Sequence, residues 1–246
     1  MRIAVVSDIH SNLEALDAVL ARARDERADT TYVLGDIVGY GADPDAVVAR
    51  LAEQPSTVCV AGNHDLAATG RFDTDWFNAI ATDAIRWTVS IMSDETRSFL
   101  AGLEPRAEAT EGLLVHGSVV DPAAEYVMNV EAARASFDAG AFARCFFGHT
   151  HLPTLFVNEG GRIDGVALRD GEPVSLARDG SKRFMINPGS VGQPRDGDAR
   201  ASMMIVDTDA ASAVVHRVPY AIDRAAGKIR DAGLPIALAE RLAYGR

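Results

Sequence analysis

Short apolar runs alternate with helical patterns in the first quarter of the chain. The runs predict three strands, namely RIAVVS at 2–7, TTYVLGD at 30–36 and TVCVAGN at 57–63. The first run leads into SNLEALDAVLARARDE, where apolar residues recur at helical spacing and Ser11 and Glu14 are spaced as a capping box. Asp43 before Pro44 is typical of a helix start and predicts a helix to about Leu51. This alternation favours an α/β fold.

A helical pattern takes over in an insert at about residues 66–109, in which Ser93 is placed to cap a second helix. Strand-like runs return in GLLVHG, ARCFFGH, RFMINPGS, ASMMIVD and AVVHRVP. Further helical stretches at about 222–245 close the chain. No internal repeat, low-complexity segment or linker rich in proline, glycine or serine divides it. We therefore expect residues 1–246 to form a single domain.

Composition and charge limit the partners and the location. With 246 residues, 48% of them hydrophobic, the chain is long enough to bury a sizeable core. A formal net charge of -11 argues against a nucleic-acid backbone or an anionic membrane as a broad-surface partner, although a local phosphate site is compatible with it. No run approaches the roughly 20 apolar residues that span a bilayer, and the first residues lack a signal-peptide pattern. We expect a cytoplasmic protein with Cys59 and Cys145 reduced and buried, and a homo-oligomer is compatible with the sequence.

Side chains that can bind metals gather just after the predicted strands. Five of the six histidines lie there with two aspartates and an asparagine, the full set being Asp8, His10, Asp36, Asn63, His64, His116, His149 and His151. In open α/β sheets, ligands bind in the crevice outside the strand ends. Residues i and i+2 of an extended segment point to the same side, so Asp8 with His10, and His149 with His151, are each expected to present two ligands to one place. His216, inside a strand-like run, is interpreted as a structural residue.

The metal hypothesis depends on the set of motifs, because glycine paired with Asp or Asn is also an ordinary turn former. The blocks are DIH (8–10), GDIVGY (35–40), GNHD (62–65), HG (116–117) and GHTH (148–151). This ordered series resembles the calcineurin-like metallophosphoesterase superfamily over roughly residues 1–195. NPGSVGQPRDGD at 187–198 further resembles the bacterial and archaeal phosphodiesterase-like branch of that superfamily.

The resemblance implies a four-layer α/β/β/α sandwich of two mixed β-sheets flanked by helices, with a binuclear metal centre. One ion is expected on Asp8, His10 and His151, the other on Asn63, His116 and His149, with Asp36 bridging both. The cofactors would be two divalent transition-metal ions per chain. Neutral imidazoles and oxygen ligands make manganese the first choice, with iron, zinc, nickel or cobalt as alternatives. The lack of thiolate ligands disfavours a purely structural zinc site.

The implied activity is hydrolysis of a phosphate ester by attack of metal-bound hydroxide. The branch resemblance favours a phosphodiesterase acting on a small phosphate ester, with a nucleotide as one candidate. A phosphomonoesterase and a dinucleoside polyphosphate hydrolase stay open, because the same metal centre serves all three. A non-catalytic protein-interaction scaffold is the alternative from another class, and a domain that binds a nucleotide without cleaving it is a third.

The resemblance also implies roles beside the metals. His64 is expected to donate a proton to the leaving oxygen or a hydrogen bond to the phosphoryl group. Asp65 is expected either to act catalytically next to His64 or to cap a helix. Substrate contacts are expected from His64, from Asn63, from Asn12 at a helix N-terminus and from Arg195, for which a solvated surface position is the alternative.

The insert follows GNHD directly, so we expect it to overhang the site. Its aromatic residues Trp76, Phe77 and Trp87 have two interpretations. They could stack on a nucleobase, or they could form the apolar face of a packed helix, and packing in a core is favoured.

Overall fold

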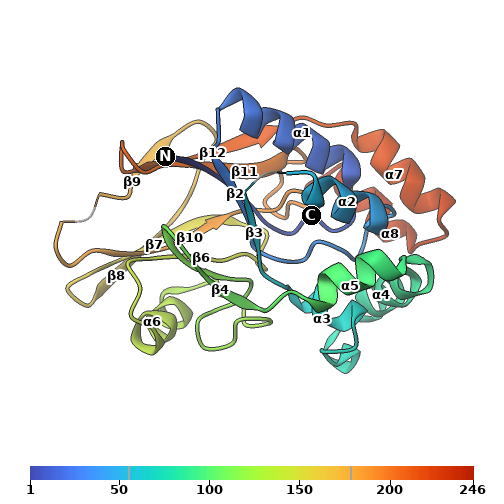
Figure 1. The fold of residues 1–246 in the computed structure, drawn as a ribbon, viewed down its shortest axis with the longest axis horizontal. Coiled ribbons are helices and arrows are strands. Elements are labelled where there is room, and N and C mark those ends of the chain that lie inside the picture. The colour runs from blue at the N-terminus through green and yellow to red at the C-terminus, as the bar shows by residue number, and fades with distance from the viewer. Residues whose placement is uncertain (55, 178) are drawn as a thin grey trace.

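The computed structural model describes residues 1–54, 56–177 and 179–246, and it places two β-sheets between layers of helices (Figure 1). The first sheet has the strand order β3 (Thr57–Cys59), β2 (Thr30–Val33), β1 (Arg2–Val6), β11 (Ala201–Asp207), β12 (Ser212–Val218) and β9 (Pro173–Ser175). The second has the order β4 (Arg106–Ala109), β5 (Gly112–Val115), β6 (Arg144–Phe146), β10 (Arg183–Pro188), β7 (Pro153–Glu159) and β8 (Arg162–Ala167). Both sheets are mixed. Strands β1, β2 and β3 run parallel in the first sheet and β5, β6 and β10 in the second, whereas the other neighbouring strands pair antiparallel.

The helices lie on the outer faces of the sheets and around one end of them. They are α1 (Leu13–Asp25), α2 (Pro44–Ala52), α3 (Asn63–Ala68), α4 (Ala79–Ile91), α5 (Asp94–Ala101), α6 (Val130–Ala139), α7 (Ile222–Asp231) and α8 (Ile236–Leu242), with a 3-10 turn at Thr74–Trp76. Helix α1 packs on β11 and β12, whereas α6 packs on β7 and β8 of the second sheet. In Figure 1, α6 lies across the two sheets from α1 and α2.

The alternation of side chains along single strands produces these layers. In β1, Ile3 and Val5 are buried between the two sheets, whereas Ala4 and Val6 are buried under α1 and α2. Successive strand residues point to opposite faces, so a strand that is apolar at every position must be covered on both sides. The four-layer α/β/β/α sandwich expected from the sequence is confirmed by this arrangement.

The start of α1 differs from the expected capping box. Asn12, not Ser11, is the N-cap, and its side-chain oxygen accepts the N–H of Ala15 at 3.1 Å. Ser11 has a positive φ of 51°. Glu14 does not reach back to the cap, because its carboxylate pairs with Lys228 of α7 at 2.7 Å. The tertiary ion pair therefore replaces the local capping interaction.

The predicted insert is helical only as far as Ala101. Residues 106–109 form strand β4 instead, paired antiparallel with β5 at the edge of the second sheet. The sequence RAEA places two charged residues on the exposed side, so it lacks the apolar pattern of a central strand. For the same reason the sequence does not predict β8 and β9, whose residues are largely exposed. Strand β7 and helix α6 are also absent from the prediction. The five later strand-like runs and both closing helices are confirmed, as is the cap at Ser93.

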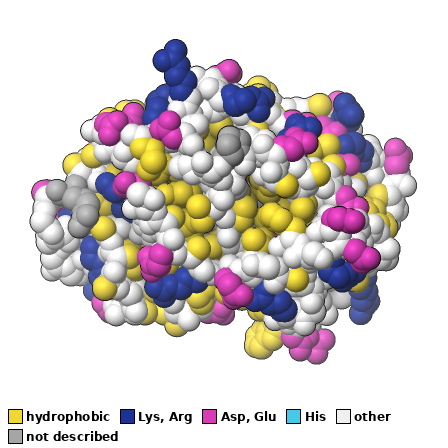
Figure 2. Space-filling view, in the orientation of Figure 1, with side chains coloured by type: hydrophobic (Ala, Val, Ile, Leu, Met, Phe, Trp, Pro, Cys, Tyr) yellow, Lys and Arg dark blue, Asp and Glu magenta, His cyan; other side chains and the backbone are white. Residues whose placement is uncertain are grey.

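The outer surface carries charges of both signs. On the face in Figure 2, Lys and Arg side chains lie among Asp and Glu side chains, and no histidine is visible on that face. Within the described residues, none of the helices has both the length and the apolar character needed to span a bilayer.

Candidate metal centre

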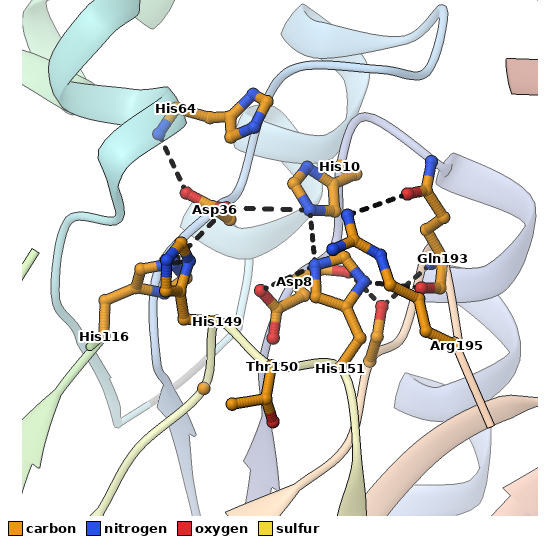
Figure 3. A network of polar contacts seen from close by, with 12 residues as sticks. Asp8, His10, Asp36, His64, His116, His149, Thr150, His151, Gln193 and Arg195 are labelled. Atoms are coloured by element: carbon orange, nitrogen blue, oxygen red, sulfur yellow. Dashed lines mark hydrogen bonds and ion pairs between the residues drawn. The ribbon is translucent and has the colours of Figure 1, made fainter. Parts of the chain in front are cut away.

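The metal-binding candidates meet in the interior where parallel strands of both sheets end (Figure 3). Asp8 and Asp36 follow β1 and β2, His116 follows β5, and His149 and His151 follow β6. All of them are buried, with at most 5% of the residue exposed. Strands far apart in the sequence therefore deliver their polar side chains to one place, as expected for the crevice beyond the strand ends.

Asp8, His10 and His151 form the first group. Nε2 of His10 lies 3.2 Å from Nε2 of His151, and the latter atom lies 3.3 Å from Oδ1 of Asp8. One ligand atom from each residue falls within 4.8 Å of the others, which is the spacing of donors around a single ion. These are the three residues that the sequence assigned to one ion.

Asp36, His116 and His149 form the second group. Nε2 of His116 lies 3.3 Å from Oδ2 of Asp36 and 3.1 Å from Nδ1 of His149. The same Oδ2 lies 3.6 Å from Nε2 of His10 in the first group, and Figure 3 shows Asp36 between the two sets of imidazoles. Asn63, expected on the second ion, lines the same cavity, and its side-chain oxygen is buried with no hydrogen-bond partner among the described residues.

Three imidazoles are oriented by backbone carbonyls. Nδ1 of His10 faces the carbonyl of Val38 at 3.3 Å, and Nδ1 of His116 faces that of Leu34 at 2.7 Å. Nδ1 of His151 faces the carbonyl of Gln193 at 2.5 Å. A carbonyl only accepts, so each Nδ1 carries a proton and each Nε2 is the ring atom directed to the interior of the site, where it can bind a metal once it is free of a proton. This is the arrangement that metal-ligating histidines use to fix their tautomer.

The backbone of the site is left-handed at five of the seven predicted ligands, namely Asp8, His10, Asp36, His149 and His151, with φ between 49° and 64°. The reason given from sequence for their convergence, an extended chain with alternating side chains, is therefore wrong. The Asp-x-His and His-x-His pairs converge through tight left-handed turns. Such a conformation costs about 1 kcal/mol or more per non-glycine residue, and strain of this kind collects at functional sites.

The chemistry of the donors fits divalent cations. Both carboxylate oxygens of Asp8 are buried without a hydrogen-bond donor among the described residues. Burial raises the pKa of Asp8 to about 7 and, for the imidazoles, lowers the pKa of His149 to about 3. Burial also holds the pKa of His10 and His151 well below the usual range. Neutral imidazoles around a buried carboxylate with free lone pairs are the donor set that divalent transition metals select.

His64 lies at the edge of this centre, in the first turn of α3. Its backbone N–H donates to Oδ1 of Asp36 at 2.9 Å, and its ring lines the same cavity as His149. The ring stacks on Phe77, with centroids 4.8 Å apart. Burial lowers the pKa of His64 to about 4, so in the metal-free protein the imidazole is neutral at pH 7.

Asp65 is turned away from the cavity. One carboxylate oxygen accepts the N–H groups of Ile37 at 2.9 Å and Val38 at 3.0 Å, and the other accepts the N–H of Gly62 at 2.9 Å. Of the two roles considered for Asp65, the structure supports the capping one, extended to a second loop. Its side chain ties the turn after β2, which carries Asp36, to the start of α3.

Asn12 and Arg195 differ in their access to the site. The side-chain amide of Asn12 donates to the carbonyl of Gly192 at 3.0 Å while its oxygen caps α1, so the side chain is engaged within the fold. Arg195 lines the cavity, and its guanidinium donates to the side-chain oxygen of Gln193 at 3.1 Å. We therefore leave Asn12 out of the substrate contacts and keep Arg195.

The segment after β10 supports the metal-binding loops. The Asn187 side chain donates to the carbonyl of Gly148 at 2.8 Å, and Ser190 donates to the carbonyl of Asp8 at 2.9 Å. Gln193 adds the carbonyl that orients His151. Sequence reasoning missed these roles, because they depend on backbone carbonyls that no side-chain pattern marks.

The cavity in front of the centre has a volume of about 550 Å³ and an aromatic outer part. Trp76 lies at this cavity with 84% of the residue exposed, so the expectation of core packing is wrong for Trp76. Trp87 and Phe77 are partly buried against an apolar cluster that includes residues of α4, α7 and α8, and Phe77 also lines the cavity. Tyr126, which the sequence did not single out, lines the cavity and stacks on His149 with centroids 3.8 Å apart.

Comparison with known proteins agrees with this geometry. The model of the calcineurin-like phosphoesterase superfamily domain matches residues 1–211. A metallophosphoesterase from Sphaerobacter thermophilus with a crystal structure is 41% identical, and the alignment covers 100% of this chain and 99% of that one with a TM-score of 0.89. An uncharacterized protein of Methanocaldococcus jannaschii is 37% identical over 99% of this chain and 98% of its own. The chain belongs to the calcineurin-like phosphoesterase superfamily.

The fold extends to more distant sequences. A hypothetical protein from Pyrococcus horikoshii is 18% identical, with 100% of this chain and 98% of that chain aligned and a TM-score of 0.81. At this identity the likeness concerns the fold alone. A bacterial metallophosphoesterase and an archaeal protein are thus both similar to this chain over nearly its full length, whereas the phosphodiesterase-like character of the branch stays a prediction.

Proposed function

We propose that this metallophosphoesterase hydrolyses a phosphodiester at two divalent metal ions. The observation that carries the proposal is the position of Asp36, whose Oδ2 lies within 3.6 Å of His10 and 3.3 Å of His116, between two separate groups of ligands. Asp8, His10 and His151 would hold one ion and Asn63, His116 and His149 the other, with Asp36 shared. When bound, two ions at such a site supply a water of lowered pKa and positive charge beside the phosphoryl oxygens.

The protein side chains orient the ester. His64 is buried and held through its backbone by Asp36, so its ring has a fixed position at the cavity wall. As a neutral imidazole it donates a hydrogen bond to the leaving oxygen, which stabilises the charge that develops there as the ester bond breaks. Arg195 pairs with a non-bridging phosphoryl oxygen from the other side of the cavity mouth.

The charge of the cavity favours a diester over a monoester. Among the described residues that line it, Arg195 is the single Lys or Arg, and Asp121 lies at the same cavity. A phosphodiester carries one negative charge, whereas a monoester carries about 1.5 to 2 near pH 7. Two bound ions would add positive charge for either ester, and beyond them the one guanidinium and the protein's net charge of -11 match the smaller charge better.

The test is hydrolysis of bis-p-nitrophenyl phosphate and p-nitrophenyl phosphate by protein stripped of metal and refilled with Mn²⁺. We expect manganese-dependent turnover of the diester that exceeds turnover of the monoester and is absent in Asp36→Asn. Faster hydrolysis of the monoester would overturn the diester assignment in favour of a phosphomonoesterase. Two bound ions with no turnover of either ester would contradict the catalytic proposal and favour a protein-interaction scaffold.

A further inference from the structure

The outer wall of the cavity is built from aromatic rings of the insert. Phe72 and Phe77 lie with centroids 5.9 Å apart, and both line the cavity with Trp76. Trp76 belongs to the short 3-10 turn Thr74–Trp76 and leaves 84% of its surface exposed. An indole this exposed at the mouth of a pocket leaves a large flat apolar surface for a ligand to cover.

This aromatic wall begins at His64. Phe77 stacks on the His64 ring at 4.8 Å with an interplanar angle of 30°, Phe72 is the next ring along the wall, and the largely exposed Trp76 lines the same cavity. Under the proposed function, the His64 ring faces the leaving oxygen of the ester. The group attached to that oxygen must then extend over Phe77 toward Trp76.

The same cavity also carries polar groups that match the edge of a heterocycle. The side-chain oxygen of Asn78 accepts the N–H of Ala81 at 3.0 Å, which leaves the Asn78 amide N–H groups available as donors at the cavity. Asp121 also lines the cavity, and its carboxylate accepts the N–H groups of Ala123 and Ala124 with lone pairs to spare. A cavity with a donor, an acceptor and a stacking surface suits a nucleobase, because the edge of a base carries both donors and acceptors.

We propose that the leaving group of the substrate is a nucleoside whose base stacks on Trp76. The inference rests on the proposed function, because the location of the leaving group is deduced from the role proposed for His64. The oxygen of a water bonds to phosphorus, the bond between phosphorus and the nucleoside oxygen breaks, and a proton released by that water ends on the nucleoside oxygen, which gives the free nucleoside and a phosphomonoester. The single guanidinium of Arg195 among the described lining residues matches one phosphate, and not a polyphosphate chain.

Fluorescence can report the stacking directly, because the chain has two tryptophans. In a Trp87→Phe background, Trp76 is the remaining indole, and the metal-loaded protein would be titrated with adenosine 5′-phosphate and with ribose 5-phosphate. We expect saturable quenching by the nucleotide and roughly tenfold weaker binding of the sugar phosphate, since base stacking on an aromatic side chain gives an effect of this size. If Trp87→Phe does not fold, inhibition constants of the two compounds against bis-p-nitrophenyl phosphate hydrolysis by the unsubstituted protein replace the titration.

Variants separate this subsite from the catalytic centre. Trp76→Ala should weaken binding of the nucleotide roughly tenfold and leave binding of ribose 5-phosphate unchanged. The control Tyr244→Ala removes an aromatic residue that is 67% exposed and is not among the residues that line the cavity, and it should change neither affinity. Equal affinity for the two compounds, or a Trp76→Ala variant that binds both as before, would overturn the subsite while leaving ester hydrolysis intact. Nucleotide binding that depends on Trp76, without turnover of any ester, would overturn the proposed catalysis and retain the subsite.

Discussion

The backbone N–H of His64 donates to Oδ1 of Asp36 at 2.9 Å, so the residue proposed to face the leaving oxygen is fixed to the carboxylate proposed to join the two ions. The other oxygen of Asp36 faces His10 and His116. One carboxylate therefore ties the start of α3, which carries His64, to the metal-binding groups. Metal binding and the geometry of the leaving group are coupled through a single side chain.

Asp36→Asn should break this coupling while keeping the shape of the side chain. An amide retains one oxygen to accept from His64 but lacks the negative charge that offsets two cations. We expect the variant to bind less than two ions per chain and to lose more than about hundredfold in turnover, because even residues behind the ligands affect metal sites by about 10 to 100-fold. Elemental analysis after dialysis measures the metal content, and full occupancy in Asp36→Asn would contradict the bridging role.

His64→Ala should retain both ions and lose turnover by about a hundredfold, the usual size of a general acid or hydrogen-bond donor contribution. The substitution leaves the backbone N–H that holds Asp36, so the ligand geometry is preserved. Metal analysis and steady-state kinetics on the same preparation check both halves. Loss of an ion in His64→Ala would assign this residue to the ligands.

Metal uptake should release protons, in amounts that depend on pH. In the metal-free protein, burial opposes protonation of His116, but the Asp36 carboxylate outweighs it and raises the pKa of His116 to about 9. At pH 7 a metal must therefore displace a proton from this imidazole. We expect metal affinity to rise between pH 7 and 9, and calorimetric titrations in buffers of different ionisation enthalpy to show net proton release at pH 7 that disappears above pH 9.

The raised pKa of His116 also makes the free energy of unfolding depend on pH. The pKa of His116 is higher in the folded metal-free protein than the ordinary histidine value of 6.5, so the stabilisation from its charged form is fully present below about pH 6.5. It is lost as the pH rises through about 9. Chemical denaturation of metal-free protein should show this loss, and His116→Gln should lack it.

Asp65→Asn should weaken the junction between two loops without touching the cavity. The amide can accept from only one oxygen, so its NH2 group would face either the N–H of Gly62 or those of Ile37 and Val38. A buried donor left facing a donor costs about 1–3 kcal/mol, so we expect the free energy of unfolding to fall by that amount. Asp83→Asn, on the exposed side of α4, is the matched control and should leave stability unchanged.

Arg195→Ala tests the contact with phosphate. The variant should raise the KM of the diester and lower kcat/KM by about tenfold, the effect of one lost charge-assisted hydrogen bond of roughly 1.5 kcal/mol. Arg200→Ala, a surface arginine paired with Asp198, provides the control. Unchanged kinetics in Arg195→Ala would remove this residue from the substrate contacts.

The sequence predicts the central strands and the candidate ligands because both leave strong local signals. Short apolar runs such as IAVV of β1, flanked by turn-forming residues, indicate central strands, and the metal-binding side chains recur directly after several of them. The edge strand β4 leaves no such signal, because alternate residues of the strand are exposed to water. Asp65 shows the same limit inside the site, since its partners Ile37 and Val38 are 27 or 28 residues away and offer only backbone groups.

The left-handed turns at Asp8, His10, Asp36, His149 and His151 have a consequence for laboratory evolution. At each position glycine would relieve the backbone strain, because it adopts a positive φ without steric cost. A screen that rewards heat resistance alone should therefore collect glycines at these positions, and the most robust clones should be the ones that no longer bind metal. Only a screen that also rewards hydrolysis should keep this part of the sequence unchanged.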